Sequence, residues 1–165
     1  MIFPWPGKAS AIRGEEGSTL VEFSVSITLL LTVMFGILDC SRILYYDHYV
    51  RYAAEEGARY AMVRGSSWNN AACSTTQTAS CTATSTNITN FVKGIATFGN
   101  MSSLTVATTW TGKTPSGSNC SNANGNNSPG CVVNVKVTYN FTFVLPFLPR
   151  NAVNLTSAAA MAIAR

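Results

Sequence analysis

Hydrophobic and polar residues divide the chain into two unlike parts. Residues 18–38 form an apolar run that contains one charged side chain, Glu22. At about 1.5 Å per residue, a helix over this run spans roughly 30 Å, which is the thickness of the hydrocarbon core of a bilayer. The pattern therefore predicts a transmembrane helix. A carboxylate inside such a helix is costly, so Glu22 is a candidate functional residue.

The helix is predicted to continue beyond the bilayer over residues 39–64, a segment without proline. Two acid-before-base pairs at a spacing of four, Asp47 with Arg51 and Glu55 with Arg59, favour a helix there. Two stripes, or rows of side chains, run along the surface of this helix, one mainly of tyrosines and one of small residues. They are Tyr45, Tyr49, Tyr52 and Glu56, and Val50, Ala54, Gly57 and Ala61.

Two stripes indicate two contacts, one with the chain's own globular part and one with another helix. For the tyrosines the alternative is anchoring at the membrane interface together with core packing. Gly36 and Gly57 are the two positions at which the helix is expected to bend. Gly65 is expected to end it.

Beyond residue 65 the pattern predicts shorter elements in a background of Ser, Thr and Asn. These are an amphipathic helix over residues 87–98 capped by Thr86 or Asn87 and ended by Gly99, strands over 104–110 and 133–143, and a last strand over 153–163 whose Ala-rich end is also compatible with a helix. Residues 111–130, rich in Gly, Asn and Ser, are expected to be the most exposed and least constrained loop.

The predicted fold is therefore α+β. A long N-terminal helix covers one face of a small antiparallel sheet of about three strands. The predicted divisions are a leader (1–17), a transmembrane helix (18–38), an extracytoplasmic continuation of that helix (39–64) and a disulfide-stapled domain (65–165).

Five cysteines bear on the compartment. Four of them, Cys73, Cys81, Cys120 and Cys131, lie in the C-terminal part, and four cysteines allow three pairings. Loop-closure entropy favours near neighbours, Cys73 with Cys81 and Cys120 with Cys131. Disulfides require an oxidising compartment, which puts the C-terminal domain outside the cytoplasm and the leader inside it.

The fifth cysteine, Cys40, follows the apolar run. Its context, Ile37-Leu38-Asp39-Cys40, is similar to a lipoprotein cleavage site, but the neighbouring Asp39 and the length of the run argue against lipidation. A buried structural thiol is the expected role. Basic residues do not decide the orientation, because within about 15 residues of the apolar run two lie on each side, Lys8 and Arg13 before it and Arg42 and Arg51 after it.

Charge and chemistry argue against several functions. The formal net charge is +4, and the basic residues are too scattered for nucleic-acid binding. All seven acids precede residue 57 (Glu15, Glu16, Glu22, Asp39, Asp47, Glu55 and Glu56). The single histidine, His48, is expected to be a helix-surface residue rather than a ligand or a base. Without a triad, a carboxylate pair or a C-x-x-C motif, the chain is not expected to be an enzyme or to hold a metal or cofactor.

The N-terminal motif resembles a known signal. A leader ending in Gly17, then Glu22 and Phe23, then the apolar run, is similar to a type IV prepilin signal. Residues 36–39 (GILD) and 53–61 (AAEEGARYA) resemble TadE-like proteins in particular. Such proteins are pseudopilins or minor pilins of the bacterial Flp pilus, a type IVb pilus assembled by the Tad system.

The resemblance implies a site and a set of partners. A prepilin peptidase would cut between Gly17 and Ser18, and Glu22, followed by Phe23, would then attract the N-terminal amine of a neighbouring subunit. Glu15 and Glu16 make this leader less basic at the cut than the usual prepilin pattern. The implied partners are the peptidase, other pilins through the N-terminal helix, the inner-membrane Tad machinery and the lipid bilayer.

The implied location is the bacterial inner membrane, with one span, a cytoplasmic leader and a periplasmic domain that can enter an extracellular pilus. The implied roles are pilus assembly, secretion, adherence and biofilm formation. The alternative is an uncleaved bitopic membrane protein whose outer domain binds a surface or a ligand.

Overall fold

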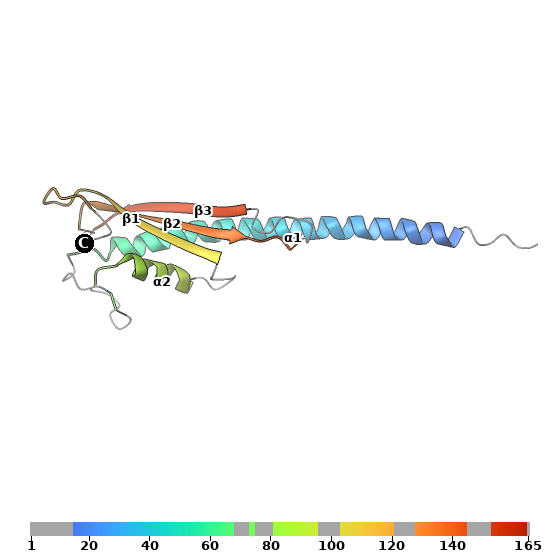
Figure 1. Ribbon diagram of the computed structural model, residues 1–165, viewed down its shortest axis with the longest axis horizontal. Helices are drawn as coiled ribbons and strands as arrows, with labels where there is room; N and C mark the ends of the chain where they lie inside the picture. The colour runs from blue at the N-terminus through green and yellow to red at the C-terminus, as the bar shows by residue number, and fades with distance from the viewer. Residues whose placement is uncertain are drawn as a thin grey trace, which may run out of the picture.

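The fold is a long helix that carries a small domain on its C-terminal half. A computed structural model describes residues 15–67, 73–74, 81–95, 103–120, 128–144 and 153–164. In chain order the elements are α1 (Glu15–Met62), α2 (Ser85–Ile95), β1 (Leu104–Gly112), β2 (Cys131–Phe141) and β3 (Val153–Ala162). The N-terminal half of α1 projects away from the domain (Figure 1). The predicted α+β fold is confirmed.

The helix α1 joins the predicted transmembrane segment and its predicted continuation in one element. It begins at Glu15 and ends at Met62, close to the expected bounds, and the backbone N–H of Arg64 donates to the carbonyl of Ala61 at 3.1 Å. No linker separates the apolar run from the domain. The N-terminal half of α1 and the domain are therefore joined by one continuous helix, which acts as a single rod.

One of the two predicted ion pairs on α1 is correct. The Nε of Arg51 lies 3.0 Å from a carboxylate oxygen of Asp47. Arg59 pairs instead with Glu56, at 3.3 Å, and not with Glu55. Positions three and four residues apart are both neighbours on a helix surface, and the partly buried Glu56 is the partner that Arg59 reaches.

The three strands form one antiparallel sheet in the order β1-β2-β3. In β2, buried residues alternate with more exposed ones along its length. This strand occupies residues 131–141 rather than the predicted 133–143, because it begins opposite the end of β1, where Cys131 pairs with Gly112. The Ala-rich end of β3 is a strand, since its pairing with β2 outweighs the helix propensity of alanine.

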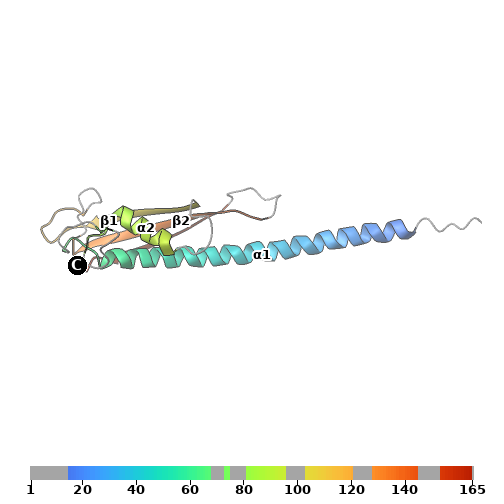
Figure 2. The ribbon, with the colours of Figure 1, turned by 90° about the horizontal axis from the view of Figure 1, so that it is seen from below.

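The core lies between the sheet and the two helices (Figure 2). The small-residue stripe of α1 is buried in it, which confirms the predicted contact with the chain's own domain. At Gly57 the helix comes close to two other elements: a Cβ there would lie 2.8 Å from Cγ2 of Val92 in α2 and 3.2 Å from Cγ1 of Val135 in β2. The missing side chain lets three elements meet.

The helix α2 begins two residues earlier than predicted because its cap is Thr84, not Thr86 or Asn87. The backbone N–H and the hydroxyl of Thr84 donate to Oδ1 of Asn87 at 3.0 and 2.6 Å, and the N–H of Asn87 donates back to the Thr84 hydroxyl at 3.3 Å. This is a capping box. Ile88 and Val92 are buried, as expected of the apolar face. Gly99, the expected end, lies outside the described residues.

Both disulfides are present as near-neighbour pairs, Cys73–Cys81 and Cys120–Cys131. The second one shapes the segment that was expected to be unconstrained. There β1 runs on to Gly112, whose carbonyl accepts from the N–H of Cys120 at 3.0 Å, and Thr114 is buried. Residues 111–119 are exposed apart from Thr114, as predicted, but these hydrogen bonds constrain them, which was not predicted. Residues 121–127 lie outside the described part.

Candidate functional site

The predicted cut lies on the surface of the first turns of α1. Gly17 and Ser18 are exposed, and a Cβ placed on Gly17 would meet nothing within 4 Å. The helix already begins at Glu15, so the predicted boundary of the leader at residue 17 is not a break in the helix. Helix ends open at little cost, which leaves this bond accessible. Residues 1–14 lie outside the described part of the chain.

Glu22 and Phe23 follow on the same exposed helix, with apolar side chains on either side of them. The ion pairs of the described residues all lie farther along α1, and none of them involves Glu22. In water such a carboxylate is stabilised by hydration. In a hydrocarbon environment it would need a partner, because an isolated buried charge is strongly unfavourable.

The apolar run that follows is exposed from Leu20 to Leu38. By length and composition it can cross a membrane: its best window has a mean hydropathy of 2.1 and is 0% buried within the protein. Three of its hydroxyls bond within the helix: Ser24, Thr28 and Thr32 each donate to the carbonyl four residues earlier at 2.7–2.8 Å. The run is therefore compatible with a single membrane-spanning helix.

A buried carboxylate marks the point where the apolar run meets the domain. Asp39 is 3% exposed, and Nη1 of Arg42 lies 3.0 Å from its Oδ1. The backbone N–H of Val144, just beyond β2, donates to both carboxylate oxygens at 3.2 Å. Sequence reasoning gave Asp39 no role, although it is the first charged residue after Glu22. Its neighbour Cys40 is exposed, so the expected buried thiol is wrong.

Aromatic rings gather beside this junction. Tyr46 of α1 stacks on Tyr139 of β2 with 4.7 Å between ring centroids, and it meets Phe141 edge-on at 5.8 Å. Phe143 packs edge-on against Phe141 at 5.3 Å, and the guanidinium of Arg42 lies 5.2 Å from the Phe141 centroid. The end of the sheet nearest the apolar run is thus aromatic, with one ion pair beside it.

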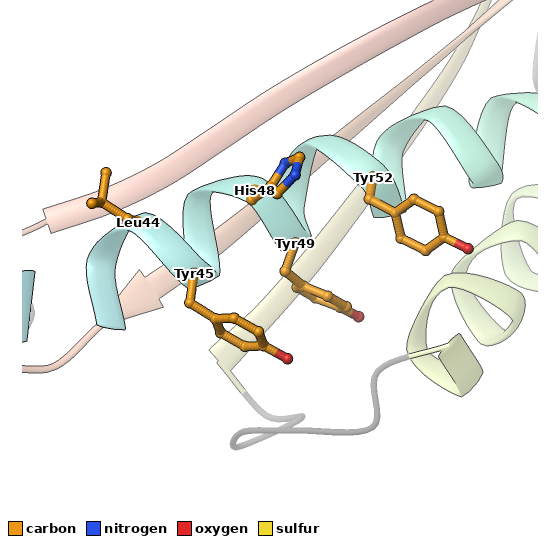
Figure 3. A pocket seen from close by; sticks show the side chains of 5 residues that line it. All are labelled: Leu44, Tyr45, His48, Tyr49 and Tyr52. Carbon is orange, nitrogen blue, oxygen red and sulfur yellow. The ribbon is translucent and has the colours of Figure 1, made fainter. Parts of the chain in front are cut away.

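The tyrosine stripe lies on another side of α1. Leu44, Tyr45, His48, Tyr49 and Tyr52 line a groove of about 470 Å³, and the three tyrosine rings project from the same side of the helix (Figure 3). Burial raises the pKa of Tyr49 above its ordinary value, and Tyr45 adds to the shift. Among the described residues, the buried hydroxyl of Tyr49 has no hydrogen-bond partner. His48 is exposed.

The described residues offer no arrangement for metal chemistry. Within them, no three side chains of the His, Cys, Asp and Glu types come together to hold an ion. What they do offer is a long helix with an exposed apolar N-terminal half, the Asp39–Arg42 pair bonded to Val144 at the end of that half, and a domain packed on its C-terminal half.

One family model matches this part of the chain. Residues 17–59 match the family described as TadE-like protein, which confirms the resemblance over these residues. The match begins at the predicted cut, stays within α1 and does not reach the sheet. No curated protein and no solved structure matches the chain. The family match supports, in general, a protein associated with the Tad pilus.

Proposed function

We propose that this chain is a minor pilin or pseudopilin of the Flp pilus, processed by prepilin peptidase between Gly17 and Ser18. Its roles would be in Tad pilus assembly, secretion, adherence and biofilm formation. The observation that carries the proposal is the exposed apolar half of α1, which has Glu22 near its start and lies inside the TadE-like match. A soluble domain would not leave such a surface uncovered.

The proposed mechanism follows from the charge at Glu22. Cleavage frees an amine at Ser18, at the start of the spanning helix. In a medium of low dielectric, an ammonium and a carboxylate stabilise each other strongly, and each is costly alone. The amine of one subunit and Glu22 of its neighbour would then hold two helices together, and the apolar run would supply the packing surface.

The proposed location is the bacterial inner membrane, with the leader in the cytoplasm and the domain in the periplasm. The two disulfides support this orientation, because disulfides persist in oxidising compartments. The proposed partners are prepilin peptidase, other pilins and the inner-membrane assembly machinery. A structural role also agrees with the TadE-like family, which is not known as enzymatic.

The test is the mass and the N-terminal sequence of the chain after coexpression with a prepilin peptidase of a Tad system. We expect a mature chain that begins at Ser18. The variant Gly17→Val should remain uncut. Gly36→Val is the matched control, because a Cβ at Gly36 also meets nothing within 4 Å, and it should be cut normally. A chain that keeps Met1 beside an active peptidase would refute processing.

A second candidate is an uncleaved bitopic protein whose outer domain binds a surface or a ligand. The observation in its favour is that α1 runs through the predicted cut without a break. The same mass measurement separates the two candidates, because only the first removes the leader.

A further inference from the structure

We propose that the end of the sheet at residues 142–144 rests on the bilayer beside α1, so that the lipid headgroup region covers Val144. The domain would then contact the membrane at a second place besides the spanning helix. This inference rests on the proposed function in one respect: it requires residues 18–38 to span the bilayer.

The depth of Val144 follows from its bond to Asp39. Residues 18–38 span roughly 30 Å as a helix, so the hydrocarbon core ends close to Asp39. Side chains on a helix tilt toward its N-terminus and cover the preceding turn. Because both carboxylate oxygens of Asp39 accept from the N–H of Val144, the backbone of Val144 lies beside the last turn of the apolar run.

Both views of the fold agree with this placement. In Figures 1 and 2, β2 runs along α1 and its end points toward the N-terminal half of the helix. The opposite end of the sheet lies near the C-terminal end of α1, where the N–H of Ala164 donates to the carbonyl of Met62 at 3.1 Å. The sheet therefore directs one end at the membrane and the other end away from it.

The polar groups at this end of the sheet are paired with one another within the protein, as an environment with little water requires. Val144 lies beyond the last residue of β2, so its N–H has no place in the β-ladder. The Asp39 carboxylate accepts it, and Arg42 offsets the charge of that carboxylate. Backbone groups near lipid must be satisfied within the protein, and a paired charge is tolerated there far better than a single one.

The surface itself is apolar and aromatic. The side chain of Val144 is 58% exposed and continues the exposed apolar surface of α1, which runs to Leu38. Phe143, which is only partly buried, lies one residue earlier and packs edge-on against Phe141. The partner that this surface fits is therefore the bilayer that holds α1.

The test is the depth of a fluorophore attached at position 144 of the full chain. The background is Cys40→Ser, since Cys40 is the free, exposed cysteine of the described residues. In this background, Val144→Cys is labelled with an environment-sensitive dye and reconstituted into vesicles of phosphatidylethanolamine and phosphatidylglycerol. Two reference variants are labelled in the same way. Leu30→Cys reports the apolar run, and Ala160→Cys reports an exposed position on β3, opposite Asn134.

We expect the dye at position 144 to shift its emission to shorter wavelength and to lose emission to quenchers carried on lipid. The dye at position 160 should respond only to aqueous iodide. If position 144 behaves like position 160 while position 30 is quenched from the lipid, the second contact is refuted and the span stands. If position 30 also reads as aqueous, the spanning helix itself is refuted, and with it the proposed function.

Discussion

Asp39 of α1 and Val144 beyond β2 are joined by a bifurcated hydrogen bond across 105 residues of sequence. The bond fixes the end of β2 to α1 near the middle of the helix. Farther along, α1 packs on the sheet, so the domain is attached to the helix at two places. A carboxylate that is 3% exposed and binds both Arg42 and the backbone of Val144 is sensitive to truncation.

Asp39→Ala should therefore lower the free energy of unfolding of the domain by about 2–3 kcal/mol, as expected for a buried hydrogen bond to a charge. The N–H of Val144 loses its acceptor, and Arg42 is left without its partner carboxylate. The measurement is urea unfolding in detergent, followed by circular dichroism. Asp47→Ala, which breaks an exposed pair with Arg51, should change this free energy by less than about 1 kcal/mol. Equal effects of the two variants would contradict the role given to Asp39.

Gly57→Ala should destabilise the domain by about 1–3 kcal/mol, the usual range for an overpacked core. The new methyl would lie 2.8 Å from Cγ2 of Val92, so that the Val92 side chain or the helix that carries it has to shift. Adding Val92→Ala should restore part of the loss. Gly36→Ala has open space and should be neutral or stabilising, because alanine favours a helix. The measurement is thermal unfolding, in the same detergent, of the unmodified chain, the two single Gly→Ala variants and the double variant. Equal midpoints for Gly57→Ala and Gly36→Ala would contradict the prediction.

Loss of the Cys120–Cys131 disulfide should cost about 2–4 kcal/mol, the usual range for a native disulfide. Cys131 is fully buried at the start of β2, and Cys120 is buried beside the end of β1, so the bridge closes that end of the sheet. The variant is Cys120→Ser with Cys131→Ser, measured by its urea midpoint. Cys73→Ser with Cys81→Ser is the comparison. It should cost less, since Cys73 is only partly buried; a larger loss there would contradict the ranking.

Glu22→Ala should leave cleavage intact and lower the amount of the chain that enters assembled filaments. The carboxylate is proposed to act after the cut, on the amine of a neighbour. The measurement is an immunoblot of sheared filaments beside a blot of the processed chain in membranes. Ser26→Ala, one turn later on the same exposed run, should leave incorporation unchanged. Equal filament yield from both variants would overturn the role of Glu22.

Alkaline pH should destabilise the domain, partly through Tyr49. Burial raises the pKa of this phenol in the folded state above the 10.0 of a free tyrosine. The neutral phenol is therefore favoured by folding. Its contribution to stability is complete below pH 10 and is lost as the pH rises through the folded-state pKa. Burial also raises the pKa of Tyr139, which therefore destabilises the domain at alkaline pH in the same way.

Tyr49→Phe should reduce this loss of stability above pH 10. It should cost nothing at pH 7, since it removes a buried hydroxyl that has no partner among the described residues. Unfolding midpoints between pH 8 and pH 11 provide the measurement, with Tyr52→Phe as the exposed control. A pH profile identical to that of the unmodified chain would show that Tyr49 does not carry the effect.

Local patterns were enough to predict most of the elements. The run from Ser18 to Arg64 contains no proline, and the alternation from Val133 to Phe143 favours a strand. The two-residue error in β2 kept every side chain on its correct face, because the period of a strand is two. The near-neighbour disulfides followed from loop closure alone.

The junction could not be predicted, because it depends on contacts between distant parts of the sequence. Nothing in the sequence near Asp39 indicates that the N–H of Val144 will reach it. Asp39 is buried and the next residue, Cys40, is exposed, so the prediction for Cys40 failed because the position of the buried face was wrong by one residue. The cap at Thr84 was missed for a simpler reason: Ser, Thr and Asn are so frequent there that several positions could cap the helix. The close approach at Gly57 was missed because its neighbours, Val92 and Val135, come from two other elements.

The single rod of α1 has a mechanical consequence. A helix without a joint between its apolar half and its domain-bearing half transmits rotation as well as pull. Turning the apolar half about its long axis turns the sheet with it. In the proposed pilin, the face of the apolar half that neighbouring helices contact would therefore decide which way the sheet faces, although the two lie at opposite ends of the helix.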